Sequence, residues 1–274
     1  MHSHHALSSY VGEFLMSMMK LKSRLRETQD RLTLHLCTIP SAVVTQALAT
    51  VGADGVIVDL EHGAVDYASA HAMIAATAGT DCAPLVRITI NEPAHVKRAL
   101  DIGAEGIVFP LINSAHDAHD AVASLRYPPG GTRGFGPFIA QSRWGAQMQT
   151  YRKTVEDHLV CCLLIETRSA VEAIEEICGV PGVDIIIPAQ FDLSTALGIS
   201  GQFDHPDFIA AVSRVERTAL AAGLPLGGVA FSRAQAETLF ARGYRIIVGF
   251  DVLCLRDQAA EMRSWATLPT SVAS

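Results

Sequence analysis

The chain of 274 residues lacks several features that mark common functional classes. No apolar run approaches the ~18 residues of a membrane-spanning helix, and the amino terminus lacks the apolar segment of a secretory signal peptide. A basic surface is also missing, because the net charge is −7 and the lysines and arginines are scattered along the chain. We therefore expect no membrane segment and no nucleic-acid partner, since phosphate backbones bind clustered positive charge.

Cysteines with the spacing of a disulfide framework or a zinc site are absent as well. Most of the six cysteines lie inside or beside apolar runs, where a free thiol packs like a small hydrophobic side chain. They are Cys37, Cys82, Cys161, Cys162, Cys178 and Cys254. Since free thiols persist in a reducing compartment, we expect the protein to be cytoplasmic.

What the chain does contain is a repeated alternation of short apolar segments with helix-like segments. Hydrophobic residues make up 49% of the chain and charged residues 18%, as in a protein with a large buried core. The apolar segments are residues 32–37, 55–60, 84–90, 106–111, 160–165, 183–187, 225–230 and 245–250. The helix-like segments are residues 41–51, 67–78, 92–102, 115–125, 169–177, 207–222 and 232–241. Continuous apolar strands that alternate with helices indicate a parallel sheet covered on both faces.

Eight such units in about 230 residues are typical of a (β/α)8 TIM barrel, so the expected fold class is α/β. No Gly-x-Gly-x-x-Gly motif follows the first strand, which argues against a dinucleotide-binding sheet. We expect one domain, with an N-terminal extension over residues 1–20, a barrel over residues 21–256, and a C-terminal helix and tail over residues 257–274. The segment 127–137 (YPPGGTRGFGP) is interpreted as a functional loop.

Two acidic residues stand at equivalent places on successive apolar strands. Glu166 follows the strand at residues 160–165, and Asp192 comes just after the strand at residues 183–187. A carboxylate at the end of a buried strand is costly to desolvate unless a cation or hydrogen bonds compensate its charge. The pair therefore predicts a hard divalent cation held between two carboxylates.

A second group of polar residues follows two other predicted strands. Asp59, Glu61 and His62 come after the second strand, and Arg87 lies in the third. In a barrel of this type the catalytic groups come from the carboxyl ends of several strands. Taken singly, each acid could cap the next helix and His62 could be an ordinary loop histidine. The convergence of these groups on one end of the barrel favours an active site.

A series of motifs in a fixed order carries a resemblance to a known family. The motifs are residues 55–62 (GVIVDLEH), Arg87, 100–104 (LDIGA), 106–110 (GIVFP), 127–134 (YPPGGTRG), 165–167 (IET), 182–184 (GVD), 192–194 (DLS) and 197–198 (LG). With them the chain resembles the HpcH/HpaI family, the class II pyruvate aldolases that act on 4-hydroxy-2-oxo acids. The similarity runs from about Leu21 to Leu255, nearly the whole expected barrel.

The resemblance implies a role for each polar residue of the site. Glu166 and Asp192 would bind a divalent metal cation, Mg²⁺, Mn²⁺ or Co²⁺, which the 2-oxo acid chelates through its carboxylate and keto oxygens. Arg87 would stabilise the oxyanion of a pyruvate enolate, and His62 would transfer protons. Asp101 would orient His62, although it could also be an ordinary acid at a helix end.

Further roles follow from the same resemblance. Asp59 and Glu61 are expected to hold metal-bound waters or the loop that carries His62. In the family the C-terminal helix is exchanged between subunits, usually in hexamers built from dimers. The residues themselves show only an amphipathic segment at 256–266 whose apolar stripe needs cover. We therefore expect a homo-oligomer, with a hexamer implied by the resemblance.

Two segments depart from the family pattern. The family usually has Gln two residues before its metal-binding glutamate, and this chain has Leu164. It usually has Gly-Pro shortly before its metal-binding aspartate, where this chain reads Ala189-Gln190-Phe191 and where family members hold the substrate carboxylate with backbone amides. The expected substrate-binding residues are Arg87, Gln190, Phe191 and Asp192. Both departures alter the expected donor pocket, in which Gln190 offers either a new hydrogen bond or a solvent-facing amide.

The expected function is a metal-dependent aldolase that joins or separates a pyruvate-like 2-oxo acid and an aldehyde through an enolate. Decarboxylation of oxaloacetate uses the same intermediate and is an expected side activity. One alternative is an acyl-CoA lyase of the citrate lyase β type, which needs a basic patch at the barrel mouth; only Arg133 and Arg143 are candidates for it. Another is a binding barrel without catalysis, which only the departures at Leu164 and residues 189–191 favour.

Overall fold

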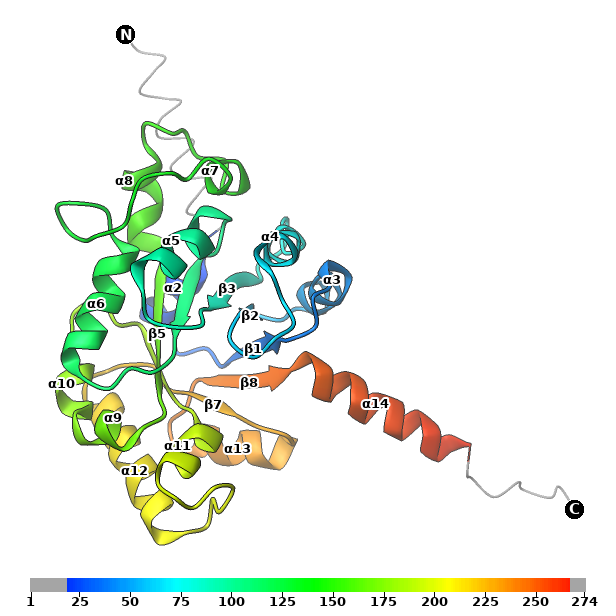
Figure 1. The fold of residues 1–274 in the computed structure, drawn as a ribbon. Helices are drawn as coiled ribbons and strands as arrows, with labels where there is room; N and C mark the ends of the chain where they lie inside the picture. Colours follow the sequence, from blue (N-terminus) through cyan, green and yellow to red (C-terminus); the bar gives the residue numbers. More distant parts are fainter. Residues whose placement is uncertain (1–18, 267–274) are drawn as a thin grey trace, which may run out of the picture.

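The structure is a computed structural model that describes residues 19–266. Eight parallel strands follow one another around a barrel (Figure 1). They are β1 (Leu32–Cys37), β2 (Gly55–Asp59), β3 (Ala83–Arg87), β4 (Gly106–Phe109), β5 (Val160–Ile165), β6 (Ile185–Pro188), β7 (Gly227–Val229) and β8 (Ile246–Phe250). The barrel closes between β6 and β7, where Ile186 and Leu226 form a parallel bridge and the Ile186 amide donates to the Pro225 carbonyl at 3.1 Å. The predicted (β/α)8 fold is confirmed.

Helices cover the outside of the barrel between successive strands (Figure 1). They are α3 (Ala42–Thr50), α4 (Tyr67–Ala75), α5 (Pro93–Asp101), α6 (Ala115–Leu125), α9 (Arg168–Glu172), α10 (Ile174–Cys178), α12 (Pro206–Ala221) and α13 (Arg233–Ala241). Five begin at a capping side chain that accepts a backbone N–H three residues on, as Ser41 does for α3. The single helix predicted at residues 169–177 is divided at Ala173 into α9 and α10.

Shorter helices that the sequence patterns did not predict complete the described chain. They are α2 (Leu21–Glu27), α7 (Ala140–Arg143), α8 (Tyr151–Val155), the 3-10 turn η1 (Glu156–His158) and α11 (Gln190–Ala196). Most are too short to show an amphipathic period, which explains why periodicity missed them. None of the helices in residues 19–266 is long and apolar enough to cross a membrane.

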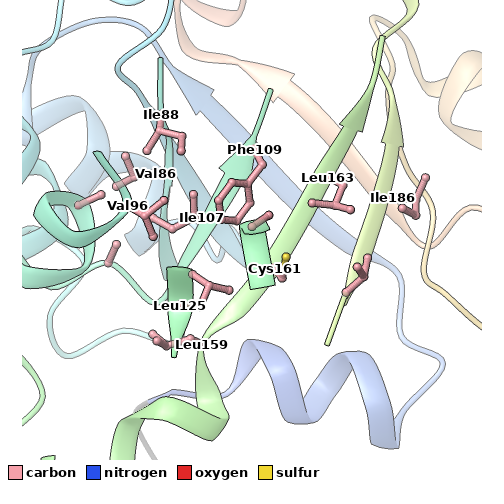
Figure 2. Packing of buried hydrophobic residues seen from close by; sticks show 14 of the residues in the cluster. Val86, Ile88, Val96, Ile107, Phe109, Leu125, Leu159, Cys161, Leu163 and Ile186 are labelled. Carbon is pink, nitrogen blue, oxygen red and sulfur yellow. The ribbon is translucent and has the colours of Figure 1, made fainter. Parts of the chain in front are cut away.

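Alternate residues of each strand pack into two separate apolar layers. Residues that point outward fill the space between strands and helices, as Figure 2 shows for Val86 and Ile107 near Val96 of α5. Residues that point inward form a second cluster inside the barrel. Because successive side chains of a strand point to opposite faces, the strand sequence decides which residues enter the barrel.

The amino end of the barrel is closed by α2. Its residues Leu21 and Leu25 belong to the interior cluster, and buried Lys22 pairs with Asp184 at 2.9 Å. The Lys22 ammonium also donates to the Leu159 carbonyl at 2.6 Å, so its charge is compensated without water. The expected N-terminal extension over residues 1–20 lies outside the described residues except for Met19 and Lys20.

The last helix, α14 (Asp251–Trp265), extends from the end of β8 away from the barrel (Figure 1). It begins at Asp251, earlier than the predicted segment 256–266, and the Asp251 carboxylate accepts the backbone N–H groups of Thr38 and Ile39. Along its length the apolar side chains Val252, Leu255, Met262 and Trp265 are exposed. Within residues 19–266, nothing covers this apolar stripe of α14.

Candidate active site

Strand alternation brings three charged side chains to the carboxyl end of the barrel. On β5 the inward positions are Cys162 and Leu164, and Glu166 is the next residue in that series. The same alternation carries Asp59 at the end of β2 and Arg87 at the end of β3, which are paired in register. Each of these strands therefore has an apolar inward stretch that ends in a charged group.

A cavity of about 330 Å³ opens at this end of the barrel. Its polar lining residues are Thr38, Asp59, His62, Arg87, Gln190 and Asp192. Its apolar lining residues are Leu36, Ile57, Val108, Leu164, Ile187, Ala189, Phe191, Val229, Val248 and Phe250. Strands β2 and β3, the turn after β2 and the start of α11 thus contribute the charged or amide-bearing groups of the cavity, and the other strands contribute a large apolar surface.

Asp59 holds two parts of the site in place. Its fully buried carboxylate accepts two hydrogen bonds from Arg87, at 2.9 Å from Nε and 2.7 Å from Nη2. It also accepts the backbone N–H groups of Glu61 at 3.1 Å and His62 at 3.3 Å. A bidentate pair fixes the plane of a guanidinium, so Asp59 orients Arg87 and the turn that carries His62 together.

Glu61 and His62 lie beside that pair. The Glu61 carboxylate is 3.3 Å from Arg87 Nε and 3.9 Å from His62 Nε2. Burial raises the pKa of Glu61, and the charge of Arg87 opposes this shift. The imidazole of His62 borders the cavity and keeps 66% of its side-chain surface exposed, so it can meet a ligand that enters from solvent.

Glu166 is buried beside the cavity and near Asp192, which lies in the first turn of α11. Burial raises the pKa of Glu166 to about 7; the negative charges of Asp192 and Glu61 act in the same direction, while its hydrogen bond from the Leu111 amide opposes them. Leu111 has a positive φ of 57°, a strained conformation that aims its N–H at the carboxylate. The sequence did not predict this contact, because leucine rarely adopts a backbone conformation with positive φ.

The chemistry of these donors fits a hard divalent cation. Glu61, Glu166 and Asp192 influence one another electrostatically, and Arg87 is the cation that balances them among the described residues. Within residues 19–266, no group of three or more His, Cys, Asp and Glu side chains is arranged as a complete metal site. Two carboxylates with the rest of the shell open is a common arrangement for Mg²⁺, which keeps several waters.

Two aromatic side chains, Phe191 and Phe250, line the cavity, and Phe203 and Phe231 pack against them. The ring of Phe191 lies 5.2 Å from Phe203 and 6.1 Å from Phe231, and Phe231 stacks on Phe250 at 6.2 Å. Of these rings the sequence patterns had singled out only Phe191. Phe250 could have been identified from alternation, because it follows Val248 at the next inward position of β8.

Asp101 lies at the other end of the barrel. It is the last residue of α5, which runs back toward the amino ends of the strands, and it pairs with Arg133 at 2.7 Å. The guanidinium of Arg133 is fully buried between the rings of Tyr127 and Tyr151. The structure thus brings Asp59, Glu61, Arg87, Glu166 and Asp192 together with His62, Gln190 and Phe191, but does not bring Asp101 to His62 within one protomer.

The two arginines considered for a basic patch at the mouth do not lie there. Arg133 is paired with Asp101, and Arg143 donates to the hydroxyl of Thr77 at 2.8 Å while stacking on Trp144 at 4.4 Å. Both belong to the segment between α6 and β5 that also contains the expected functional loop at residues 127–137, at the barrel end opposite the cavity. None of its residues lines the cavity.

Comparison with protein-family models finds one match over most of the chain. The model described as HpcH/HpaI aldolase/citrate lyase matches residues 35–257. The chain is 34% identical over 223 residues to the 2-dehydro-3,6-dideoxy-6-sulfogluconate aldolase of Pseudomonas putida, covering 81% of this chain and 87% of that protein. It is 36% identical over 218 residues to the hydroxypyruvate/pyruvate aldolase of Chromohalobacter salexigens, covering 79% and 85%.

Solved structures show the same architecture. An HpcH/HpaI aldolase/citrate lyase family protein from Burkholderia cenocepacia superimposes with a TM-score of 0.87 at 31% identity, covering 92% of this chain and all (100%) of that one. An HpcH/HpaI aldolase from Desulfitobacterium hafniense gives a TM-score of 0.83 at 30% identity. A citrate lyase β subunit from M. tuberculosis is more distant, with a TM-score of 0.54 at 19% identity, and shares the fold alone.

Proposed function

The chain belongs to the HpcH/HpaI aldolase/citrate lyase family, and from this premise we propose that it is a divalent-metal-dependent aldolase of 4-hydroxy-2-oxo acids. It forms or cleaves the bond between the third carbon of a pyruvate-like 2-oxo acid and the carbonyl carbon of an aldehyde. The observation that carries this proposal is the convergence of Arg87, Glu166, Asp192 and His62 on one end of the barrel.

Glu166 and Asp192 would hold the metal, as Mg²⁺, Mn²⁺ or Co²⁺. Their oxygens are the hard ligands that such ions prefer, and the excess of carboxylates over cations around them favours an added positive charge. When bound, the cation supplies Lewis-acid stabilisation of negative charge on a keto oxygen. Names of relatives support this substrate class, because several are pyruvate or hydroxypyruvate aldolases.

Arg87 would stabilise the oxyanion that develops when the third carbon of the 2-oxo acid loses a proton. Its guanidinium is already fixed by Asp59 at the cavity wall, so it needs no reorganisation during the reaction. His62, at the exposed side of the cavity, would move the proton of the substrate hydroxyl at its imidazole. Loss of carbon dioxide from oxaloacetate leaves the same enolate, so this decarboxylation is a proposed side activity.

A homo-oligomer is part of the proposal. The exposed apolar stripe of α14 needs a covering surface, and a second copy of the chain would supply one. Asp101 lies away from His62 in the protomer, so the proposed orienting contact of Asp101 with His62 would have to come from a neighbouring copy. A hexamer is the state that the family resemblance favours.

Hydrogen–deuterium exchange of pyruvate methyl protons in D₂O tests the proposed function before any aldehyde is known. We expect exchange with Mg²⁺, Mn²⁺ or Co²⁺, loss of exchange after chelation, and recovery when metal is returned. Glu166→Gln and Asp192→Asn should remove both metal binding and exchange. Glu172→Gln, at an exposed glutamate of α9 outside the cavity, is the matched control and should retain both.

The same samples separate the competing functions. Full exchange in a metal-stripped enzyme would contradict the metal-dependent mechanism. Metal binding without exchange of any 2-oxo acid would favour a binding barrel without catalysis. Saturable turnover of an acyl-CoA ester would favour the citrate lyase type, although Arg133 and Arg143 do not form the basic patch that such a substrate needs at the mouth.

A further inference from the structure

The floor of the active-site cavity is aliphatic. It is formed by inward side chains one step below the charged rim: Leu36, Ile57, Val108, Leu164, Ile187 and Val248. Leu164, Ile187 and Val248 each keep 5% of their surface exposed. In the next layer down, Leu34, Cys162 and Ile246 are 0% exposed. The cavity therefore reaches the upper layer of the barrel interior and stops there.

The polar groups of the cavity lie above this floor. Asp59 and Arg87 are tied to each other, and Gln190 and Asp192 come from the start of α11 at the rim. The floor itself offers only carbon atoms to a bound molecule. A substituent that enters it must be apolar, because a hydroxyl group there would lose its hydrogen bonds to water without replacement.

Leu164 has a particular position in this floor. It is the inward residue of β5 directly before Glu166, so its side chain lies below the carboxylate proposed to bind the metal. A 2-oxo acid held at that carboxylate has its third carbon within a few bonds of the chelating atoms. A group attached to that carbon and directed downward would meet the side chain of Leu164.

We propose that the donor pocket favours a 2-oxo acid with an alkyl substituent on its third carbon, the class of 2-oxobutanoate, over one with a hydroxyl substituent there, and that Leu164 determines this preference. This inference rests on the proposed aldolase function. The third carbon loses a proton to a base, the electron pair of that C–H bond forms the C2–C3 double bond, and the π pair of the C2 carbonyl moves to its oxygen, which gives the enolate. The carbonyl forms again in the next step, when the C2–C3 π pair makes the new carbon–carbon bond. This bond joins the third carbon to the aldehyde carbon, whose oxygen takes up a proton, so no oxidant or reductant is needed.

Two donors of nearly equal shape test the preference. 2-Oxobutanoate and hydroxypyruvate differ at the third carbon by a methyl in place of a hydroxyl group, and pyruvate serves as the reference. Deuterium incorporation at the third carbon is followed by mass spectrometry with Mg²⁺, without aldehyde and against an enzyme-free blank. We expect kcat/KM for 2-oxobutanoate to exceed that for hydroxypyruvate on the order of 10- to 100-fold, as hydrophobic pockets discriminate hydroxyl isosteres.

Substitutions of Leu164 test whether this residue determines the donor preference. Leu164→Gln places a hydrogen-bonding amide in the floor and should reduce the ratio by about tenfold or more, whereas Leu164→Met keeps the floor apolar and should preserve the ratio. Titration calorimetry gives the dissociation constants of the three donors and reports the preference independently of turnover. The difference should appear in binding and KM, because the side chain contacts the substituent and not the reacting oxygen.

The outcomes distinguish failure of this inference from failure of the function. Absence of exchange with every donor and metal would remove the proposed function and this inference with it. Exchange of pyruvate, with hydroxypyruvate equal to or better than 2-oxobutanoate, would leave the aldolase intact and overturn the inference. An unchanged ratio in Leu164→Gln would overturn the role of Leu164. Discrimination between hexanal and glycolaldehyde without discrimination between donors would assign the floor to the acceptor and also overturn it.

Discussion

The two ends of the barrel both contain buried charged side chains, but they compensate those charges in different ways. At the amino end Asp184 pairs with buried Lys22 at 2.9 Å and with the more exposed Arg26 at 3.4 Å, and the other hydrogen bonds of Lys22 and Asp184 go to the Leu159 carbonyl and the Cys161 amide. Arg133 and Asp101 form another pair at the same end. Each charge of these pairs meets an opposite charge of the same chain.

At the carboxyl end the described acids outnumber the cations. Asp59, Glu61, Glu166 and Asp192 surround one arginine, Arg87. Charges that are fully compensated within the chain stabilise a fold, whereas charges left in excess create a place for a ligand of opposite sign. In barrels of this type the amino end usually serves stability and the carboxyl end serves binding and chemistry, and the active site proposed here follows that division.

The largest effect on stability is expected from removal of the Lys22–Asp184 ion pair at the amino end. Lys22→Met leaves buried Asp184 with only the longer contact to the exposed Arg26 at 3.4 Å and should lower the free energy of unfolding by about 3 kcal/mol. Urea denaturation measures the loss, and Lys22→Met combined with Asp184→Asn should recover part of it, because the amide oxygen can still accept from Cys161. The folded variant should exchange the methyl protons of pyruvate as fast as the parent does. A clear loss of exchange would contradict the assignment of the amino end to stability alone.

At the carboxyl end, Arg87→Lys should impair the reaction more than it lowers stability. Lysine keeps the charge but cannot make the bidentate contact with Asp59, so it should misplace the positive charge at the cavity wall. We expect pyruvate exchange to fall about 100-fold, roughly 2.7 kcal/mol in the barrier, with a smaller loss of folding stability. A variant that loses stability and retains its exchange rate would assign Arg87 to the fold.

Glu105 at the amino end gives a pH-dependent test. It is buried, accepts a hydrogen bond from the Leu21 amide, and burial raises its pKa from 4.5 to about 7. Below the lower value both folded and unfolded chains keep the proton. Between the two values only the unfolded chain releases it, so the free energy of unfolding falls as pH rises and stays lower above pH 7.

Glu105→Gln should remove this contribution, because glutamine can still accept the Leu21 N–H and has no charge to bury. We expect the variant to be more stable than the parent at pH 8 by on the order of 1–3 kcal/mol, and nearly equal to it at pH 4. Urea denaturation at both pH values measures the difference. A parent and variant with parallel pH profiles would contradict the assigned titration.

The smallest effect on protomer stability is expected on α14, which lies outside both ends. Leu255→Gln interrupts its exposed apolar stripe and should change the unfolding free energy of the protomer by less than about 0.5 kcal/mol. It should nevertheless lower the oligomeric state seen by light scattering after gel filtration. Gln258→Glu, another exposed change on α14, is the control and should leave assembly intact. Equal assembly of both variants would exclude the stripe as a subunit contact.

The alternation of inward and outward side chains along the strands could be predicted from the sequence. The apolar runs predicted all eight strands, and the period of two explains why Asp59, Arg87 and Glu166 reach the same end of the barrel. The ends of strands were less accurate: β3 stops at Arg87 and β7 is reduced to Gly227–Val229, because hydrogen bonding to neighbours and not apolarity sets where a strand ends.

Contacts between distant loops could not be read in this way. The positions of Arg133 and Arg143, the amide of Leu111 at Glu166, and the ring of Phe203 against Phe191 all depend on how connections of different length fold over the barrel. The place of Asp101 was partly accessible, since a helix that returns to the next strand must end at the amino side of the sheet.

The sequence by itself determined the barrel and the identity of the charged residues at its carboxyl end, because the direction of a strand side chain is a local property of the backbone. Only the tertiary structure decided that Asp59 holds both Arg87 and the His62 turn, that Asp101 pairs with Arg133, and that Leu164 lies in an aliphatic floor. These arrangements depend on distances between elements far apart in the chain, which are set by the packing of the whole core.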